Sequence, residues 1–145
     1  MDEAVAKERA ATPKHIWIVG ILSLVWNAFG AFDYVMTNTR NAAYLANFPP
    51  GMMDIIDAFP VWVMAAWAFG VWGALAGSVL LLLRSRHAVM AFSLSLLGLA
   101  ASTFYQFGID APEVMGMNAM TLIIWIIAVL LLLYSIRLRG DRVLR

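Results

Sequence analysis

Hydrophobic residues along the chain gather in four long blocks, separated by polar or charged connections. The blocks cover residues 16–36, 61–83, 88–107 and 120–138. Each is close to the length of about 20 residues that an α-helix needs to cross the hydrocarbon of a bilayer. The pattern predicts an all-α membrane protein, a four-transmembrane-helix bundle that forms a single domain over residues 1–145. A signal peptide is the alternative interpretation of the first block, because basic residues precede it and Ala28-Phe29-Gly30 resembles a cleavage site.

The longest connection covers residues 37–60 and is broken by Pro49-Pro50-Gly51. After this break, apolar residues recur at helical spacing with two aspartates between them: Met52, Ile55, Ile56 and Phe59, with Asp54 and Asp57. The spacing predicts a short amphipathic helix that lies on the membrane surface. An irregular loop with chance spacing is the alternative.

The distribution of charge orients the four segments. Short cytoplasmic loops carry an excess of Lys and Arg. With the amino terminus inside, Arg40 is the only one of the ten Lys and Arg residues that falls outside. We therefore expect both termini to be cytoplasmic. Five acids then lie outside or at the outer edge: Asp33, Asp54, Asp57, Asp110 and Glu113.

The composition supports a membrane protein and excludes several functions. Hydrophobic residues make up 63% and charged residues 13% of the chain, against roughly half and a quarter in soluble domains. A net charge of +1 provides no basic surface for nucleic acid. The absence of cysteine excludes disulfides, thiol redox chemistry and Cys-ligated metals.

Catalytic motifs are also missing from the sequence. There is no HExxH, no Gly-rich phosphate loop, no Ser/His/Asp set and no pair of carboxylates within a span. We therefore expect no enzymatic activity, no metal and no cofactor. Two other interpretations are weaker: His15 and His87 both begin predicted helices and could bracket a haem, and the tryptophans of the spans could bind a flat hydrophobic molecule such as a quinone.

Small and polar residues form rows on three of the four predicted helices. Spacings of three and four residues place each row on one helix face. In membranes such residues let helix backbones approach closely, and hydroxyls or amides can bond across. The rows predict a compact bundle in which these residues pack between helices: Ser23, Asn27, Gly30 and Tyr34; Ala66, Gly70, Gly73 and Gly77; Ala91, Ser95, Gly98 and Ser102. The fourth helix has no such row, and we expect it to face lipid or a partner.

Polar residues in the outer half of the first and third segments are the candidate ligand-binding residues. At about 1.5 Å per residue, Asn27 lies near mid-membrane, whereas Asp33 and Tyr34 lie near the outer surface. Tyr105 and Gln106 fall at a similar height and could join Asp33 and Tyr34 in one polar cluster. The structural alternatives are an interhelical hydrogen bond for Asn27 and a pairing of Asp33 with Arg40 or with water.

Several segments together carry a resemblance to a known family: residues 24–34, Phe59-Pro60-Val61-Trp62, the Gly-rich second helix ending in residues 80–84, residues 102–105 and Val143-Leu144-Arg145. With these segments the chain resembles an uncharacterised family of small bacterial inner-membrane proteins with four spans, some of which carry the automatic label sugar transporter. The resemblance implies a bacterial inner membrane and the threading described above. It implies no reaction and no catalytic residues.

Two functions follow as hypotheses. The first is a non-enzymatic accessory or scaffold protein, working as a homo-oligomer or as a subunit of a larger membrane complex. The second is the binding or transport of a small or lipophilic molecule through an outer-facing polar mouth. A solid bundle with one flat apolar face favours the first, and a deep polar cavity favours the second.

Overall fold

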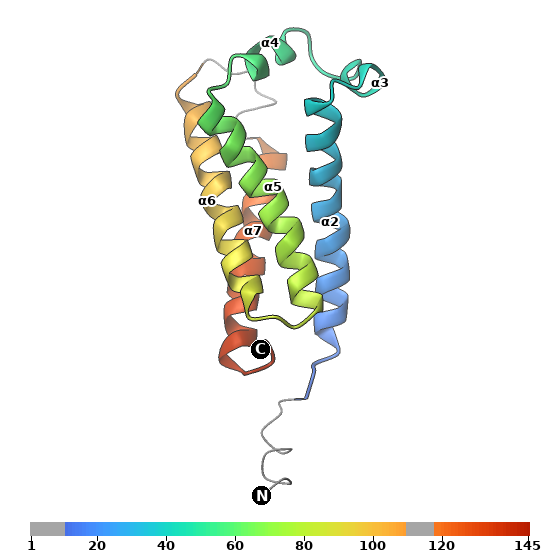
Figure 1. Cartoon of the computed structure of the whole chain (residues 1–145), viewed down its shortest axis with the longest axis vertical. Helices are drawn as coiled ribbons and strands as arrows, with labels where there is room; N and C mark the ends of the chain where they lie inside the picture. The colour runs from blue at the N-terminus through green and yellow to red at the C-terminus, as the bar shows by residue number, and fades with distance from the viewer. Residues whose placement is uncertain (1–10, 110–117) are drawn as a thin grey trace, which may run out of the picture.

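Four long helices dominate the computed structural model, which describes residues 11–109 and 118–145 (Figure 1). They are α2 (His15–Asn38), α5 (Val61–Leu82), α6 (His87–Phe107) and α7 (Ala119–Gly140). Each is long and apolar enough to cross a membrane. The prediction of an all-α chain with four long apolar helices is confirmed for the described residues. Lys7, Arg9, Asp110 and Glu113, which entered the charge argument, lie outside the described residues.

Two short helices lie in the connection between α2 and α5, at the end of the molecule away from the C-terminus (Figure 1). The sequence did not predict α3 (Ala42–Leu45), which begins where the Asn41 side chain accepts a hydrogen bond from the Tyr44 amide. The amphipathic segment forms α4 (Met52–Asp57), and its Ile56 is buried while its two aspartates are exposed. We call this part of the molecule the α3–α4 end.

The predicted small-residue rows of α5 and α6 face each other over most of their length. A Cβ added at Gly73 would lie 3.1 Å from the carbonyl oxygen of Ala91, and one added at Gly98 would lie 2.6 Å from the amide nitrogen of Gly70. The Ser95 hydroxyl donates a hydrogen bond across this interface to the Gly70 carbonyl, at 2.6 Å. Small residues let the two backbones come this close, and at Gly98 the approach leaves no room for a side chain.

Two further residues of the rows have clear positions in the same pair of helices. Gly77 of α5 lies under the ring of Phe92 on α6. Ser102 is buried on α6, where its hydroxyl donates to the Gly98 carbonyl of its own helix at 3.0 Å. The α5–α6 pair is therefore the continuous packed unit of the molecule.

Gly30 is the exception among the predicted packing residues. A Cβ added there would meet no atom within 4 Å, so the expected helix contact at Gly30 is corrected. The reason is that α2 and α5 lie closest near the C-terminal end of the molecule and diverge toward α3 and α4 (Figure 1). Gly20 lies against Leu82 where the helices are close, whereas the large ring of Tyr34 spans the wider separation to Trp67.

Among the described residues, the hydrophobic core joins all four long helices at the end that carries the C-terminus. It contains Ile16 of α2, Leu81 of α5, Phe92 of α6 and Leu138 of α7, together with Leu144 of the C-terminal segment. The start of α2, the α5–α6 turn and the end of α7 meet here (Figure 1). We call it the basic end, because its cations are Lys14, Arg84, Arg86, Arg137, Arg139, Arg142 and Arg145.

Backbone hydrogen bonds join the C-terminal segment to the α5–α6 turn at the basic end. Arg142 adopts a left-handed conformation, with φ of 57°, just after α7 and turns the chain back on itself. The Arg86 amide then donates to the Arg145 carbonyl at 2.7 Å, and the Arg145 amide donates to the Arg84 carbonyl at 2.8 Å. These bonds hold the C-terminal segment against the α5–α6 turn and bury Leu144.

Candidate functional site

Asn27 forms a link between α2 and α5. Its side-chain amide donates to the Ser78 hydroxyl at 2.8 Å and lies 3.2 Å from the Ala74 carbonyl oxygen. Ser78 is fully buried and donates in turn to Ala74. Of the two interpretations of Asn27, the geometry corresponds to the interhelical hydrogen bond, which positions α2 at its middle.

Asp33 bonds to Tyr44, a residue that the sequence reasoning missed. The Tyr44 hydroxyl donates to the Asp33 carboxylate at 2.6 Å, which ties α3 to the last turns of α2. This hydrogen bond, with burial adding to it, raises the pKa of Tyr44 to about 12. The signal in the sequence was weak: a tyrosine in the polar stretch soon after the helix, within reach of its last acid.

Arg40 pairs with Asp57 and not with Asp33, so the pairing considered in the sequence analysis is corrected. Arg40 has a φ of 54° just beyond α2, which ends the helix and turns the side chain toward α4. Its guanidinium donates two hydrogen bonds to the Asp57 carboxylate, at 3.1 and 2.5 Å. This bidentate contact lowers the pKa of the Asp57 carboxyl.

The expected polar cluster of Asp33, Tyr34, Tyr105 and Gln106 does not form as a hydrogen-bonded group within the described ranges. The Tyr34 ring packs edge-on against Trp67 and Trp72 of α5, with ring centroids 5.0 and 6.0 Å apart. The Tyr105 ring packs against Phe59 and Trp62, with both centroids at 5.5 Å. The two tyrosine rings therefore pack on different residues of α5 and of the segment before it.

A small pocket of about 150 Å³ lies between the end of α2 and α4. We call it the α2–α4 pocket. Its polar lining consists of Thr37, Asn38, Arg40 and Asp57, and its apolar lining of Met53, Ile56, Phe59 and Met64. Thr37 is only 2% exposed, and its hydroxyl has no hydrogen-bond partner within the described ranges. A buried hydroxyl without a partner is unusual, because leaving it unsatisfied costs about 1–3 kcal/mol.

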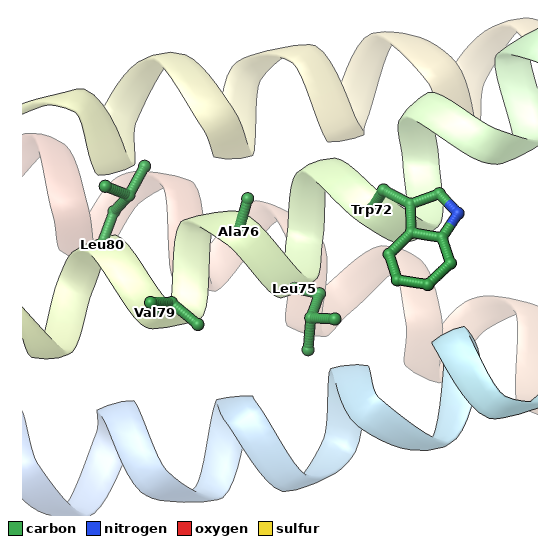
Figure 2. A pocket seen from close by; sticks show the side chains of 5 residues that line it. All are labelled: Trp72, Leu75, Ala76, Val79 and Leu80. Atoms are coloured by element: carbon green, nitrogen blue, oxygen red, sulfur yellow. The ribbon is translucent and has the colours of Figure 1, made fainter.

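A larger, apolar groove of about 560 Å³ runs along α5. We call it the α5 groove, and its lining residues Trp72, Leu75, Ala76, Val79 and Leu80 all belong to one face of that helix. Figure 2 shows this face with α2 on one side, α6 on the other and α7 behind. The groove is open and apolar, which suits hydrocarbon and offers no group for chemistry.

A row of exposed aliphatic residues on α7 forms the third feature. The residues follow one another at spacings of four, three, four and three, which is the heptad spacing of a coiled-coil seam. They lie opposite the buried residues of the same helix, Leu131, Ser135 and Leu138. We call this row the α7 seam: Leu122, Ile126, Val129, Leu133 and Ile136.

The two histidines bond to neighbouring hydroxyl groups. A ring nitrogen of His15 lies 2.6 Å from the Tyr134 hydroxyl, which links α2 to α7. His87 lies 3.2 Å from the Ser85 hydroxyl in the α5–α6 turn. Within the described ranges, no group of three or more His, Asp or Glu residues is placed to hold a metal ion.

Comparison of the chain with models of known protein families, with curated proteins and with solved structures finds no match. The functional conclusion therefore depends on the arrangement of the side chains.

Proposed function

We propose that this protein is a small multi-pass protein of the bacterial inner membrane, with four spans and both termini in the cytoplasm. The four helices have the length and composition for this. The start of α2 and the end of α7 lie at one end of the molecule (Figure 1), which carries a set of Lys and Arg residues. Arg40 lies at the α3–α4 end, where it bonds to Asp57 of α4. The resemblance noted in the sequence supports the same location.

Within that membrane, we infer a non-enzymatic role as an accessory or scaffold subunit. The α7 seam packs against a helix of a second copy or of a larger membrane complex. The observation that carries this proposal is the position of the seam: it points directly away from the residues that hold α7 to the bundle. The part of α7 before Leu131 has no buried residue, and partly buried Ile127 packs it against the core.

Exposed apolar residues alone would not support a partner, because lipid covers them equally well. The stronger point is the position of the row, directly opposite the residues that pack α7 against its own chain. Aliphatic residues at heptad spacing provide knobs that fit the holes of a facing helix, and the exposed Ile123 and Leu130 lie beside the row. Leu, Ile and Val at these positions also have few rotamers, so little side-chain entropy is lost when they pack.

The test is the size of the assembly in native membranes extracted with mild detergent or polymer. The parent chain should migrate as a complex larger than one chain. The double variant Ile126→Ala/Leu133→Ala should dissociate, because both substitutions remove knobs of the seam. The matched control is Ile123→Ala/Leu130→Ala, which alters exposed residues about a quarter turn away. A monomeric parent, or equal dissociation of both double variants, would contradict the proposal.

Binding or transport of a small or lipophilic molecule is the second candidate function. The α2–α4 pocket favours it, because this pocket combines polar and apolar walls at the end where the predicted mouth lies. Mass spectrometry of molecules retained by the purified protein tests it directly. Retention of a defined molecule that Thr37→Val reduces would support binding, and a protein that retains none would contradict it.

A further inference from the structure

The α2–α4 pocket contains a pair of opposite charges that is open to an incoming molecule. The side chains of Arg40 and Asp57 are 60% and 43% exposed, so neither is enclosed by protein. An exposed ion pair contributes little to stability, because water and salt compete for both groups. At small cost in free energy, Arg40 can therefore exchange Asp57 for an anionic group of a ligand, and Asp57 can exchange Arg40 for a cationic group.

The two charged groups differ in what they select. The guanidinium is a planar, bidentate donor suited to phosphate or carboxylate oxygens. The Asp57 carboxylate accepts from an ammonium group. Because the two side chains are adjacent, they match a molecule that carries an anionic group and an ammonium group a few bonds apart.

Thr37 provides the second and independent observation. Its side chain lines the pocket, is almost fully buried, and has a hydroxyl without a partner within the described ranges. Most buried hydroxyls are hydrogen-bonded. The oxygen of this hydroxyl is enclosed by protein, so a bound molecule reaches it when the Thr37 side chain rotates toward the pocket. The pocket has the volume of about five water molecules, taking about 30 Å³ for each.

The apolar walls and the position of the pocket indicate the rest of the molecule. Met53 and Ile56 come from the apolar side of α4, and Met64 comes from the first turn of α5. If α2 and α5 cross the membrane, the pocket lies where their ends meet the headgroup layer. A ligand held there has its polar part in the pocket and its hydrocarbon along the helices.

We propose that the α2–α4 pocket binds the zwitterionic ethanolamine phosphate group of a phospholipid, with phosphate oxygens on Arg40, the ammonium on Asp57 and a hydrogen bond to Thr37. This inference deepens the second candidate function, on which it rests, by naming the class of ligand. A soluble molecule with the same group, such as free phosphoethanolamine, offers the same contacts. The α5 groove, lower on the molecule, is apolar and can accommodate an acyl chain, but the proposal does not depend on it.

The experiment is native mass spectrometry of the full chain in detergent, titrated separately with phosphatidylethanolamine, phosphatidylcholine, phosphatidylglycerol and free phosphoethanolamine. Phosphatidylethanolamine should bind best. Choline lacks an N–H to donate to Asp57, and glycerol lacks the cation. Arg40→Gln and Asp57→Asn should each weaken its binding by about tenfold or more, as expected for a lost hydrogen bond to a charged group. Thr37→Val, which keeps the shape of the side chain, should weaken it severalfold.

The matched control is Asp54→Asn, which removes a carboxylate from the same short helix but outside the pocket lining. It should bind like the parent. Thermal unfolding of each variant separates loss of binding from loss of fold, and Thr37→Val keeps the test valid if a charge variant misfolds. Binding of free phosphoethanolamine that is lost in the same variants would support the site with a soluble source.

Two different failures remain distinguishable. Retention of no molecule by the parent would remove the second candidate function itself. Equal binding of all three lipids, or binding that Thr37→Val, Arg40→Gln and Asp57→Asn leave unchanged, would overturn only the assignment of this pocket and this ligand class.

Discussion

Helices α6 and α7 are both apolar enough to cross a membrane, yet they are held in the molecule in opposite ways. The buried residues of α6 run along its whole length, from Ala88 to Thr103. Those of α7 begin only at Leu131. The more hydrophobic helix of the two, by mean hydropathy, is therefore the less buried. In lipid, hydropathy places a helix in the membrane, whereas small residues and hydroxyls decide which helices touch.

The largest expected effect is on α6. Gly98→Ala places a methyl group against backbone atoms of Ala66 and Gly70, which cannot rotate away as a side chain could. We expect the free energy of unfolding in mixed micelles to fall by about 3 kcal/mol, the upper end of the range for overpacking. Gly30→Ala is the control, because its methyl group meets nothing within 4 Å.

The Gly30→Ala control should leave the free energy of unfolding unchanged or raise it by up to about 1 kcal/mol, because alanine favours the helix. Equal losses of unfolding free energy in the two glycine variants would contradict this account, because the close contact between α5 and α6 would then contribute nothing specific to stability.

The next largest loss of stability is expected at the C-terminal part of α7 and not at its earlier part. Leu138→Ala leaves a cavity in the core of the basic end, where the side chain is 3% exposed. We expect a loss of about 2 kcal/mol, near the lower limit for such substitutions, because the last turns of a helix can partly collapse into the space. Ile126→Ala, at 57% exposure, should leave the unfolding of the isolated monomer unchanged. A similar loss at both positions would mean that the part of α7 before Leu131 is packed within the chain.

Asn27→Ala extends the comparison to α2, which the half-buried amide of Asn27 links to the middle of α5. The expected loss is about 1 kcal/mol, as for other side-chain hydrogen bonds between membrane helices. The double variant Asn27→Ala/Ser78→Ala should lose less than the sum of the two single variants, because they remove the same contact. Strict additivity of the two losses would contradict this. Ser93→Ala is the control, since the one hydrogen bond of the Ser93 hydroxyl within the described ranges is to the Val89 carbonyl of its own helix.

The smallest effect on stability is expected from the Tyr44–Asp33 hydrogen bond, because α3 has no buried residue. The pKa of Tyr44 is raised to about 12 by its hydrogen bond to Asp33, so folding favours the protonated phenol. The contribution of this bond is fully present below pH 10 or so, the ordinary tyrosine pKa, and is lost as the pH rises toward 12. Ultraviolet titration of tyrosinate should show that Tyr44→Phe removes a group ionising near 12. Removal of a group that ionises near 10 would show that the bond is absent.

The hydrophobic pattern was sufficient to predict the four long helices, and the small-residue rows of α5 and α6 indicated their interface. The same spacing failed at Gly30, because a row shows which residues share a face but not how two helices diverge. Divergence depends on the bulk of side chains farther along, here Tyr34 and Trp67.

The pairings at the α3–α4 end could not be predicted for a different reason. They depend on the direction in which the chain leaves α2, and a left-handed conformation at Arg40 sets that direction. Hydropathy carries no information about a single backbone angle, and arginine is not the residue that usually adopts it. The bonds Arg40–Asp57 and Tyr44–Asp33 follow from this turn and from the short helix after it.

The central claim, that the α7 seam packs against another helix, is tested most directly by photo-crosslinking along α7 in native membranes. A photoreactive amino acid is placed in turn at each position from Leu122 to Ile136, and the yield of crosslinked protein is measured at each. The claim predicts maxima at Leu122, Ile126, Val129, Leu133 and Ile136. It predicts lower yields a quarter turn away, at Ile123 and Leu130, and minima on the opposite face, at Leu131 and Ser135. Yields without this period, or crosslinks only to lipid at every position, would contradict it.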